Sequence, residues 1–272
     1  MTEVKRITLL TNPDKCNKSC PLCFLQQRQR PFGMGEMPFE IAKNAIEKYG
    51  VLGNLKEVVP STMGEPLLYS HFEDLLDLCM EKGVQVQLTT NGTFPEKWGT
   101  AGGLKKLLRS CSDIKISCME FPNAFWMDNV ECLLALRKEL GAEDAATVSL
   151  QVTLHKKLLP QLQHILRWAE NVGVWRIKWN KVVFLAVASA KLREEFQIDE
   201  KDLDTLRRLL CSSKVLCQGS LFFESSNSGK YCPFKNEIWV LPDGSLENCP
   251  NPERRFGNMM AKLAQCVHCG MG

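Results

Sequence analysis

The sequence predicts an α/β fold: a partial (β/α)6 barrel followed by a small hairpin-and-helix domain at the C-terminal end. Apolar runs of strand length alternate with stretches of helical periodicity from residue 5 to about 183. This is the order expected of a parallel sheet with covering helices. The six repeats are too few for a closed barrel, which needs eight strands. An open partial barrel therefore fits the pattern.

Each expected strand is a short apolar or alternating run that ends near turn residues. The strands lie at 7–10, 57–60, 84–90, 113–119, 147–155 and 174–182. The expected helices carry apolar residues at helical spacing. They lie at 38–49, 70–82, 104–109, 123–140, 160–171 and 201–210. The second helix shows both of its boundaries, because Ser70 is a suitable N-cap and Gly83 a suitable stop.

Several strands alternate between apolar and polar residues, as in 84–89, 148–155 and 175–180. Parallel strands that are buried on both faces usually read as continuous apolar runs. We therefore expect an apolar face against the helices and a polar face that lines a substrate-binding lumen. The alternative is an antiparallel sheet with one wet face. The residues expected to face the lumen are Gln85, Gln87, Thr89, Lys115, Ser117, Gln151, Thr153, His155, Arg176, Lys178 and Asn180.

Three cysteines follow the first strand in the spacing C-x3-C-x2-C: Cys16, Cys20 and Cys23. Three thiolates leave one iron of a [4Fe–4S] cluster without a protein ligand, so that this iron is free to bind a small molecule. A structural zinc site would normally supply four ligands. The loop also follows the C-terminal end of a strand, where α/β barrels keep their chemistry.

On these residues the chain resembles the radical S-adenosylmethionine (SAM) superfamily, in which the three cysteines hold the cluster and SAM chelates the open iron. The segment 63–66, Met-Gly-Glu-Pro, is similar to the Gly-Gly-Glu-Pro motif of that family, whose backbone contacts the SAM amino group. Thr-Thr-Asn-Gly at 89–92 ends the third strand, as it does in many members. The resemblance implies that SAM is bound by Gly64, Glu65, Pro66 and Ser117.

The chain departs from the family pattern at two positions. Met63 replaces the first glycine of the motif, and Leu22 stands where an aromatic residue often precedes the last cysteine. Both changes leave the resemblance standing and bear only on the packing against the adenine of SAM.

A second set of cysteines lies near the C-terminal end: Cys232, Cys249, Cys266 and Cys269. A hairpin with an Asp-Gly turn, at 238–246, separates the first two. The arrangement is similar to the SPASM extension of radical SAM enzymes, and the short length implies its smaller twitch form. The resemblance implies an auxiliary [4Fe–4S] cluster with all four cysteines as ligands. A four-cysteine zinc ribbon is the structural alternative.

These observations divide the chain into a partial barrel at 1–185, a helical connector at 186–228 and a twitch/SPASM-like domain at 229–272. The formal net charge of +3 is too small to indicate a nucleic-acid-binding protein. No apolar run is long enough for a membrane span, and the N-terminus does not read as a signal peptide. Thirteen cysteines in such a chain indicate metal or redox chemistry in a reducing cytoplasm.

Several residues are candidates for the chemistry itself. Cys118 is a candidate for returning a hydrogen atom to the substrate, as are Cys211 and Cys217, although packing is an alternative for all three. His155 is a candidate proton acceptor, because the unperturbed pKa of histidine is near neutrality. Arg176 and Lys178 would bind an anionic group of the substrate or the carboxylate of SAM, or would counter Glu65 or another carboxylate in the lumen.

Cys79 and Cys132 lie in expected helices and are expected to pack in the core.

The resemblance implies reductive cleavage of SAM to a 5′-deoxyadenosyl radical, which abstracts a hydrogen atom from a substrate in the lumen. A reductant such as flavodoxin or ferredoxin would supply the electron. The layout is similar to the butirosin-pathway aminocyclitol dehydrogenase, and only fifteen residues precede Cys16. Both points favour a small polar metabolite such as an amino sugar or cyclitol, or a peptide delivered by a separate carrier. Uptake of an electron by the auxiliary cluster would make the net reaction an oxidation. The alternatives are a ribosomal-peptide maturase, acting by epimerisation or cross-linking, and a non-catalytic zinc-binding module.

Overall fold

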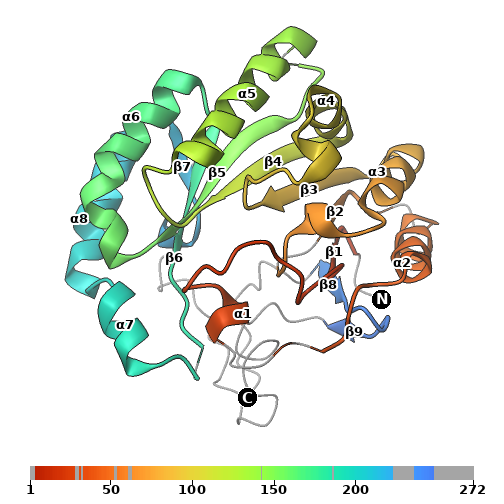
Figure 1. Cartoon of the computed structure of the whole chain (residues 1–272), viewed down its shortest axis with the longest axis horizontal. Coiled ribbons are helices and arrows are strands. Elements are labelled where there is room, and N and C mark those ends of the chain that lie inside the picture. The colour runs from red at the N-terminus through yellow and green to blue at the C-terminus, as the bar shows by residue number, and fades with distance from the viewer. Residues whose placement is uncertain are drawn as a thin grey trace. The chain divides into compact units, whose positions relative to one another are not determined.

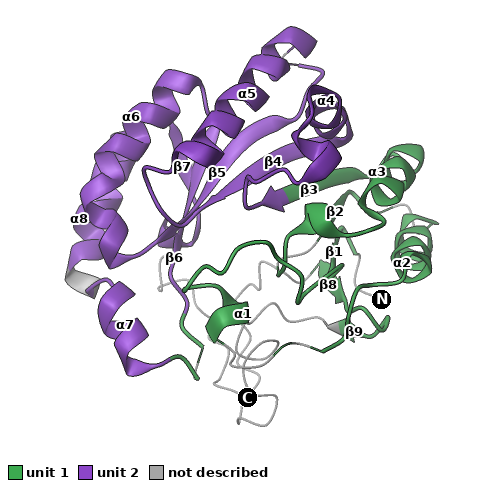
Figure 2. Cartoon of the chain, viewed as in Figure 1, with its two compact units in different colours: residues 1–88, 184–188, 224–272 green, residues 89–183, 189–223 purple. Residues whose placement is uncertain are grey.

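The computed structural model describes residues 4–27, 31, 33–51, 54–60, 63–141, 143–185, 187–222 and 236–247. The chain divides into two compact units, shown in Figure 2. Unit 1 comprises residues 1–88, 184–188 and 224–272, and unit 2 comprises residues 89–183 and 189–223. A short segment between two parts of unit 2 therefore belongs to unit 1.

Unit 1 is built around parallel strands (Figure 1). Strand β1 (Arg6–Leu9) pairs in parallel with β2 (Glu57–Pro60) on one side and with β8 (Glu237–Val240) on the other. Strand β3 (Gln85–Thr90) continues from β2, and β9 (Leu246–Glu247) is antiparallel to β8. The helices of this unit are α1 (Phe24–Gln27), α2 (Phe39–Val51), the 3-10 helix η1 (Pro66–Leu68) and α3 (Phe72–Glu81).

Unit 2 continues the same architecture with four parallel strands in sequence order. They are β4 (Cys111–Cys118), β5 (Thr147–Leu154), β6 (Arg176–Lys181) and β7 (Leu216–Gln218). Its α-helices are α4 (Ala101–Ser110), α5 (Ala124–Leu140), α6 (Leu162–Val172), α7 (Ala190–Phe196) and α8 (Glu200–Cys211). The 3-10 helices are η2 (Glu96–Gly99), η3 (Lys156–Gln161) and η4 (Ser220–Phe222).

The predicted fold class is confirmed: the chain is a parallel α/β sheet with helices, of the partial-barrel type. All six predicted strands are present, and the antiparallel alternative is wrong because β1–β2, β4–β5 and β5–β6 pair in parallel. The predicted hairpin is present as β8 and β9. Nothing in the sequence indicated that β8, the first strand of the hairpin, joins the main sheet beside β1, or that β7 pairs with β6.

The predicted boundaries of the helix at 70–82 are half right. Gly83 follows the C-cap in the left-handed conformation, with φ +64°, as predicted. Ser70 is not the N-cap, because α3 begins at Phe72 and His71 precedes it. The backbone N–H and the hydroxyl of Ser70 bind the Glu36 carboxylate instead.

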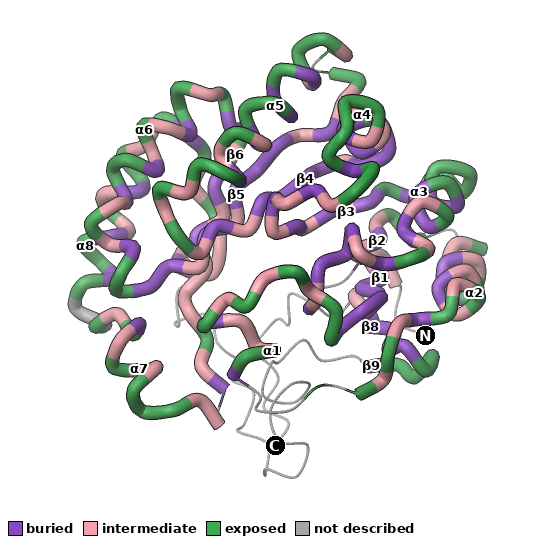
Figure 3. Tube along the Cα trace, viewed as in Figure 1, coloured by how far each residue is buried: buried purple, intermediate pink, exposed green. Residues whose placement is uncertain are grey.

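The predicted alternation of the strands is visible in burial (Figure 3). In β5 and β6 the apolar positions, such as Val152 and Trp179, are fully buried. The polar positions between them, such as Gln151 and Lys178, are half-buried. One face of the strands therefore packs in the core while the other is polar. No helix among the described residues is long and apolar enough to cross a membrane.

Candidate functional site

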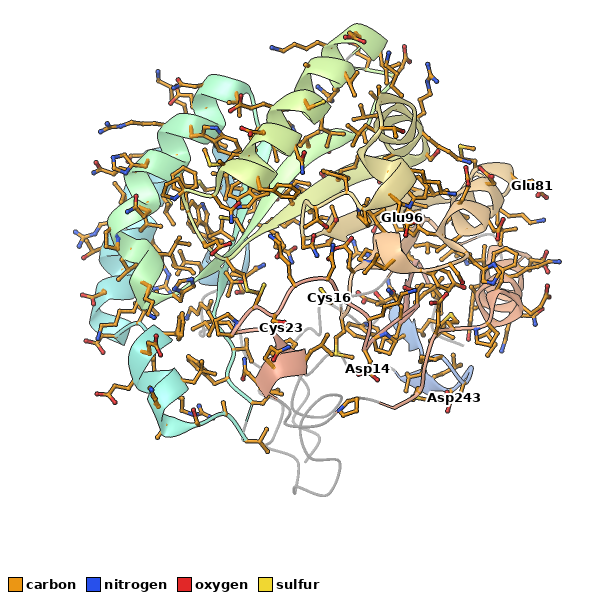
Figure 4. All side chains as sticks on the ribbon, in the orientation of Figure 1. Asp14, Cys16, Cys23, Glu81, Glu96 and Asp243 are labelled. Atoms are coloured by element: carbon orange, nitrogen blue, oxygen red, sulfur yellow. The ribbon has the colours of Figure 1, made fainter. Side chains whose placement is uncertain are left out.

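The cysteine loop, which we define as residues 11–23, connects β1 to α1, and Figure 4 shows Cys16 and Cys23 on it. All three thiols are half-buried, and none is in a disulfide. The end of the loop is a tight turn in which the Cys23 N–H donates to the Cys20 carbonyl at 3.0 Å. Near its middle, the Lys18 N–H donates to Cys16 Sγ at 3.4 Å.

The electrostatics of the loop couple two of the thiols. Burial raises the pKa of Cys23, and the nearby Cys16 raises it further, against the opposing effect of backbone hydrogen bonds from Leu25 and Gln26. A thiol is a metal ligand only as the thiolate. Loading of this loop with metal would therefore release protons and would be favoured at higher pH.

The donor set fits a cluster with three protein ligands. Within the described residues, no group of three or more His, Cys, Asp or Glu side chains is gathered as a single metal ion would require. In a four-iron cluster each thiolate binds a different iron, so the ligands need no such gathering. The three thiols of Cys16, Cys20 and Cys23 are therefore suited by type and number to an iron–sulfur cluster with one open iron.

The segment after β2 lies directly against the cysteine loop. Gly64 has φ +76°, and a Cβ at this position would overlap the Asn12 carbonyl and lie 2.8 Å from the Lys15 carbonyl oxygen. The next residue, Glu65, donates its backbone N–H to the same Lys15 carbonyl at 2.9 Å. Only glycine fits this approach, so the Gly-Glu-Pro part of the motif is explained by its contact with the loop.

A buried side chain completes the junction between these two segments. Asn12 Nδ2 donates to the Glu65 carbonyl at 2.7 Å and lies 3.4 Å from the Lys15 carbonyl. The Thr11 hydroxyl in turn donates to Asn12 Oδ1 at 2.7 Å. The Glu65 carboxylate is also buried and accepts the Leu67 N–H at 3.3 Å, which caps η1. The cysteine loop and the Gly64–Pro66 segment therefore form one hydrogen-bonded structure.

Lys15, whose carbonyl is part of this junction, also forms an ion pair with Glu36. Lys15 Nζ lies 3.4 Å from Glu36, which also accepts the Ser70 N–H at 2.7 Å. Burial acts to raise the pKa of Glu36, but the hydrogen bonds from Ser70 and the charge of Lys15 outweigh it and hold this pKa below its usual value. The sequence did not identify Glu36 as a site residue, because no local motif connects it to Lys15 or to Ser70.

Ser117, Cys118 and His155 lie in unit 2 at the carboxyl ends of β4 and β5, and Arg176 begins β6 of the same unit. Ser117 is half-buried on the polar face of β4, and Cys118 is fully buried on its apolar face. The Cys118 thiol donates to the Glu120 carbonyl at 3.6 Å. His155 is buried directly after β5, and its Nε2 lies 2.9 Å from the Met119 carbonyl, so Nε2 carries the hydrogen.

His155 has one nitrogen without a partner in the described structure. Its Nδ1 is buried and makes no hydrogen bond, while the Phe196 ring packs edge-on at 5.2 Å. Burial lowers the pKa of His155, and the ammonium of Lys157 lowers it too, against the opposing hydrogen bond to Met119. The imidazole is therefore held neutral with its lone pair on Nδ1.

Arg176 is occupied by a buried carboxylate that the sequence did not reveal. Its Nη2 donates to Asp113 Oδ2 at 2.6 Å, and Ser149 donates to Asp113 Oδ1 at 2.7 Å. Lys115 lies 3.6 Å from the same carboxylate. Burial acts to raise the pKa of Asp113, but Lys115, Ser149 and Arg176 outweigh it and lower this pKa. Of the two roles expected of Arg176, the structure shows the pairing with a lumen-side carboxylate.

Several cysteines lie outside this arrangement. Cys232, Cys249, Cys266 and Cys269 lie outside the described residues. Cys79 is fully buried, and burial raises its pKa to about 12, which agrees with a packing role. The same expectation for Cys132 is wrong, because this thiol is exposed. Cys211 is exposed as well, and Cys217 accepts a hydrogen bond from the Trp179 indole at 3.2 Å.

Comparison with known families agrees with the site. Residues 13–117 match the model of the Radical SAM superfamily, and this range includes the three cysteines, Gly64–Pro66 and Ser117. This part of the chain is therefore similar to a radical SAM domain. The family uses a [4Fe–4S] cluster and SAM, for which the cysteine loop supplies the fitting donors.

Two curated relatives match part of the chain at low identity. One is the tungsten-containing aldehyde ferredoxin oxidoreductase cofactor-modifying protein of Pyrococcus furiosus, 23% identical over 59% of this chain and 47% of the relative. The other is Fe-coproporphyrin III synthase of Methanosarcina barkeri, 23% identical over 68% of this chain and 46% of the relative. The chain thus spans about half the length of the curated relatives it matches.

The fold is also that of solved radical SAM proteins. Streptococcus suis SuiB, in a crystal structure with its precursor peptide SuiA, matches with a TM-score of 0.72 at 13% identity. The match covers 97% of this chain and 62% of SuiB. At this identity the likeness concerns the fold.

Proposed function

We propose that the chain is a radical SAM enzyme whose first cluster is held by Cys16, Cys20 and Cys23. The observation that carries the proposal is the junction between the cysteine loop and the Gly64–Pro66 segment, which Asn12 and the Lys15 carbonyl hold together. The cluster loop and the SAM motif of the family are thereby fixed against each other. When bound, such a cluster supplies the electron that cleaves SAM to methionine and a 5′-deoxyadenosyl radical, which removes a hydrogen atom from the substrate.

The residues that we propose for SAM divide between two places in the chain. Gly64, Glu65 and Pro66 present backbone beside the cysteine loop, where Gly64 permits the close approach. Ser117 supplies a hydroxyl on the polar face of β4. The buried carboxylate of Glu65 stays engaged with the Leu67 N–H, so its proposed part is to fix the backbone.

Strand register singles out the polar side chains that lie level with Ser117. Ser117 pairs with Gln151 on β5, and Gln151 pairs with Lys178 on β6. Arg176 is two residues nearer the amino end of the strands and is held by Asp113. Because Lys178 lies level with Ser117 and Arg176 does not, we propose Lys178 as the cation that meets an anionic group of the substrate or of SAM.

A pair of variants tests this assignment. Lys178→Met should raise the KM for substrate or for SAM at least tenfold and leave thermal stability within about 2 °C of the parent, as expected for a half-buried polar-face residue. Arg176→Met should lower stability, because it leaves the buried Asp113 without its closest cation. Unchanged kinetics in Lys178→Met would remove it from the site.

The polar face of the strands favours a small polar substrate, such as an amino sugar or cyclitol, which would be oxidised. A ribosomal-peptide substrate, modified by epimerisation or cross-linking, is favoured by the likeness to SuiB with its bound precursor peptide. For either substrate we propose His155 Nδ1 as a proton acceptor. Cys118 remains the proposed hydrogen donor for an epimerisation, although its burial on the apolar face supports packing.

We further propose the domain division at 1–185, 186–228 and 229–272, with a twitch/SPASM-like C-terminal domain. Its cysteines, Cys232, Cys249, Cys266 and Cys269, would hold an auxiliary [4Fe–4S] cluster that takes up the electron released in a net oxidation. A flavodoxin or ferredoxin would supply electrons to the first cluster. Support for this part comes from the spacing of the cysteines around the hairpin of β8 and β9.

Metal analysis of anaerobically purified, reconstituted protein tests both sites. We expect about eight irons and eight sulfides from two clusters, and about half of each after the triple change of Cys16, Cys20 and Cys23 to Ala. With SAM and dithionite the parent should form 5′-deoxyadenosine, and the triple variant should not. Zinc in place of iron would support the zinc-binding module, and full iron content in the triple variant would show that the N-terminal site is misassigned.

A further inference from the structure

Two buried carboxamides lie at the two ends of the cysteine loop. Asn12 is the second residue of the loop, four residues before Cys16, and Gln27 ends α1, four residues after Cys23. Both side chains are at least nine-tenths buried, with exposures of 1% and 4%. A buried amide is costly unless its donors and its acceptor are all bonded, so the partners of these two side chains show what each one holds.

Asn12 fastens the first end of the loop to the SAM motif. Its Nδ2 reaches the Glu65 carbonyl at 2.7 Å, and its backbone carbonyl accepts the Lys15 N–H at 3.1 Å. The Thr11 hydroxyl donates to Oδ1 at 2.7 Å, which fixes the orientation of the carboxamide. The segment before Cys16 is therefore held by a hydrogen bond within it, between Lys15 and Asn12, and by a hydrogen bond from Asn12 to the backbone of Glu65.

Gln27 fastens the second end of the loop to a distant part of the chain. Its Nε2 donates to the Leu22 carbonyl at 2.8 Å, and its Oε1 accepts the Leu185 N–H at 2.8 Å. Leu22 directly precedes Cys23, and Leu185 belongs to the segment 184–188 that enters unit 1 between β6 and α7. The carboxamide therefore bridges Leu22, the neighbour of the last cysteine, to Leu185, which lies 158 positions after Gln27 in sequence.

An apolar cluster supports the same two ends. Leu10, Met63, Leu185 and Trp239 pack together, with Phe24 and Leu25 of α1 against them. Both carboxamides are themselves almost fully shielded from water, which strengthens their hydrogen bonds and raises the cost of losing one.

We propose that Asn12 and Gln27 are positioning residues that hold the cysteine loop in its cluster-binding conformation before any metal is present. Neither side chain is assigned to the cluster or to SAM. Each acts through backbone that it holds: Asn12 through Glu65 and Lys15, and Gln27 through Leu22. The inference concerns the metal-free chain first, and only its consequence for cluster retention rests on the proposed function.

Hydrogen exchange of the metal-free chain tests the fastening directly. Asn12→Leu and Gln27→Met keep the size of each side chain and remove its hydrogen bonds. The first should speed exchange of the Lys15 and Glu65 amides, and the second that of the Cys23 amide, each about fivefold for the loss of one net hydrogen bond. Asn123→Ala is the matched control, because it removes the N-cap of α5 and leaves the loop untouched.

Cluster retention supplies the second readout. After reconstitution, both variants should lose iron to a chelator about fivefold faster than the parent or Asn123→Ala, and the midpoint potential of the first cluster should shift. Gln27→Glu keeps the acceptor for the Leu185 N–H and removes the donor to Leu22, so its rate of iron loss should fall between those of the parent and Gln27→Met.

The outcomes separate this proposal from the proposed function. Parental exchange rates in both size-matched variants would overturn it, as would exchange that rises equally in β4 and β5, since that would show a general loss of stability. A parent chain that takes up no iron would instead refute the proposed function, while the exchange data would still decide whether Asn12 and Gln27 fasten the loop.

Discussion

Replacing Gly64 with Ala is the most direct test of the junction between the cysteine loop and the SAM motif. The residue has φ +76°, where a side chain is strained, and its missing Cβ leaves room for two carbonyl oxygens. The added methyl would overlap the Asn12 oxygen and lie 2.8 Å from the Lys15 oxygen, well inside ordinary contact. Because both obstacles are backbone atoms, one of the two segments must move.

The size of the effect follows from two separate costs. The left-handed backbone conformation costs a non-glycine residue about 1–2 kcal/mol, and forcing an extra methyl into packed structure costs about 1–3 kcal/mol. Gly83→Ala separates them, because Gly83 has φ +64° and nothing within 4 Å of an added Cβ. We expect a loss of about 1–2 kcal/mol in unfolding free energy for Gly83→Ala and about 2–5 kcal/mol for Gly64→Ala.

Urea unfolding of the metal-free proteins measures both values, and equilibrium binding of SAM to the reconstituted proteins measures the functional cost. Gly64→Ala should weaken SAM binding at least tenfold, while Gly83→Ala should leave it unchanged. Equal stability losses in the two variants would show that the close approach of the loop and the motif is not present in solution. Parental SAM affinity in Gly64→Ala would show that this segment does not bind the ligand.

Three further predictions concern unit 2. Asp113→Leu should cost about 3–5 kcal/mol in urea unfolding, because Arg176 and Lys115 lose their buried counter-charge. Since the pKa of Asp113 is lowered by folding, the parent should also lose stability as the pH falls below about 4, and the variant should lose less there. The lowered pKa of His155 predicts that the parent loses stability as the pH falls below about 6.5, where the unfolded chain binds the proton more readily, and that His155→Gln reduces this slope between pH 7 and 5.5. Cys118→Ala should retain 5′-deoxyadenosine formation, and unchanged product would assign this buried thiol to packing.

The sequence was sufficient for the parts of the structure that carry a local pattern. The strands of the sheet alternate or run apolar, the cysteines have a distinctive spacing, and Gly83 ends its helix in the only conformation that favours glycine. Each of these signals is contained within a few neighbouring residues. These features could therefore be predicted without knowing which distant residues pack against them.

Features that depend on distant partners were not predictable in this way. Asp113 reads as an isolated acid in a strand, and its partner Arg176 lies 63 residues further on. Gln27 reads as a surface residue of a short helix, yet it is buried against Leu185. The first strand of the C-terminal hairpin was recognised, but pairing with β1 depends on which sheet edge is available, and periodicity does not contain that information.

Met63 shows how a departure from a family pattern can be explained by packing. Met63 is only 3% exposed and packs against Leu10, Leu185 and Trp239, which are distant from one another in the sequence. A glycine at this position would leave a gap among these three side chains. Methionine is suited to such irregular spaces because it is unbranched and flexible. The substitution therefore adds apolar contact behind Gly64 without changing the one position, Gly64 itself, at which the cysteine loop requires the absence of a side chain. In this chain the first residue of the motif has room for a side chain, and the second has none.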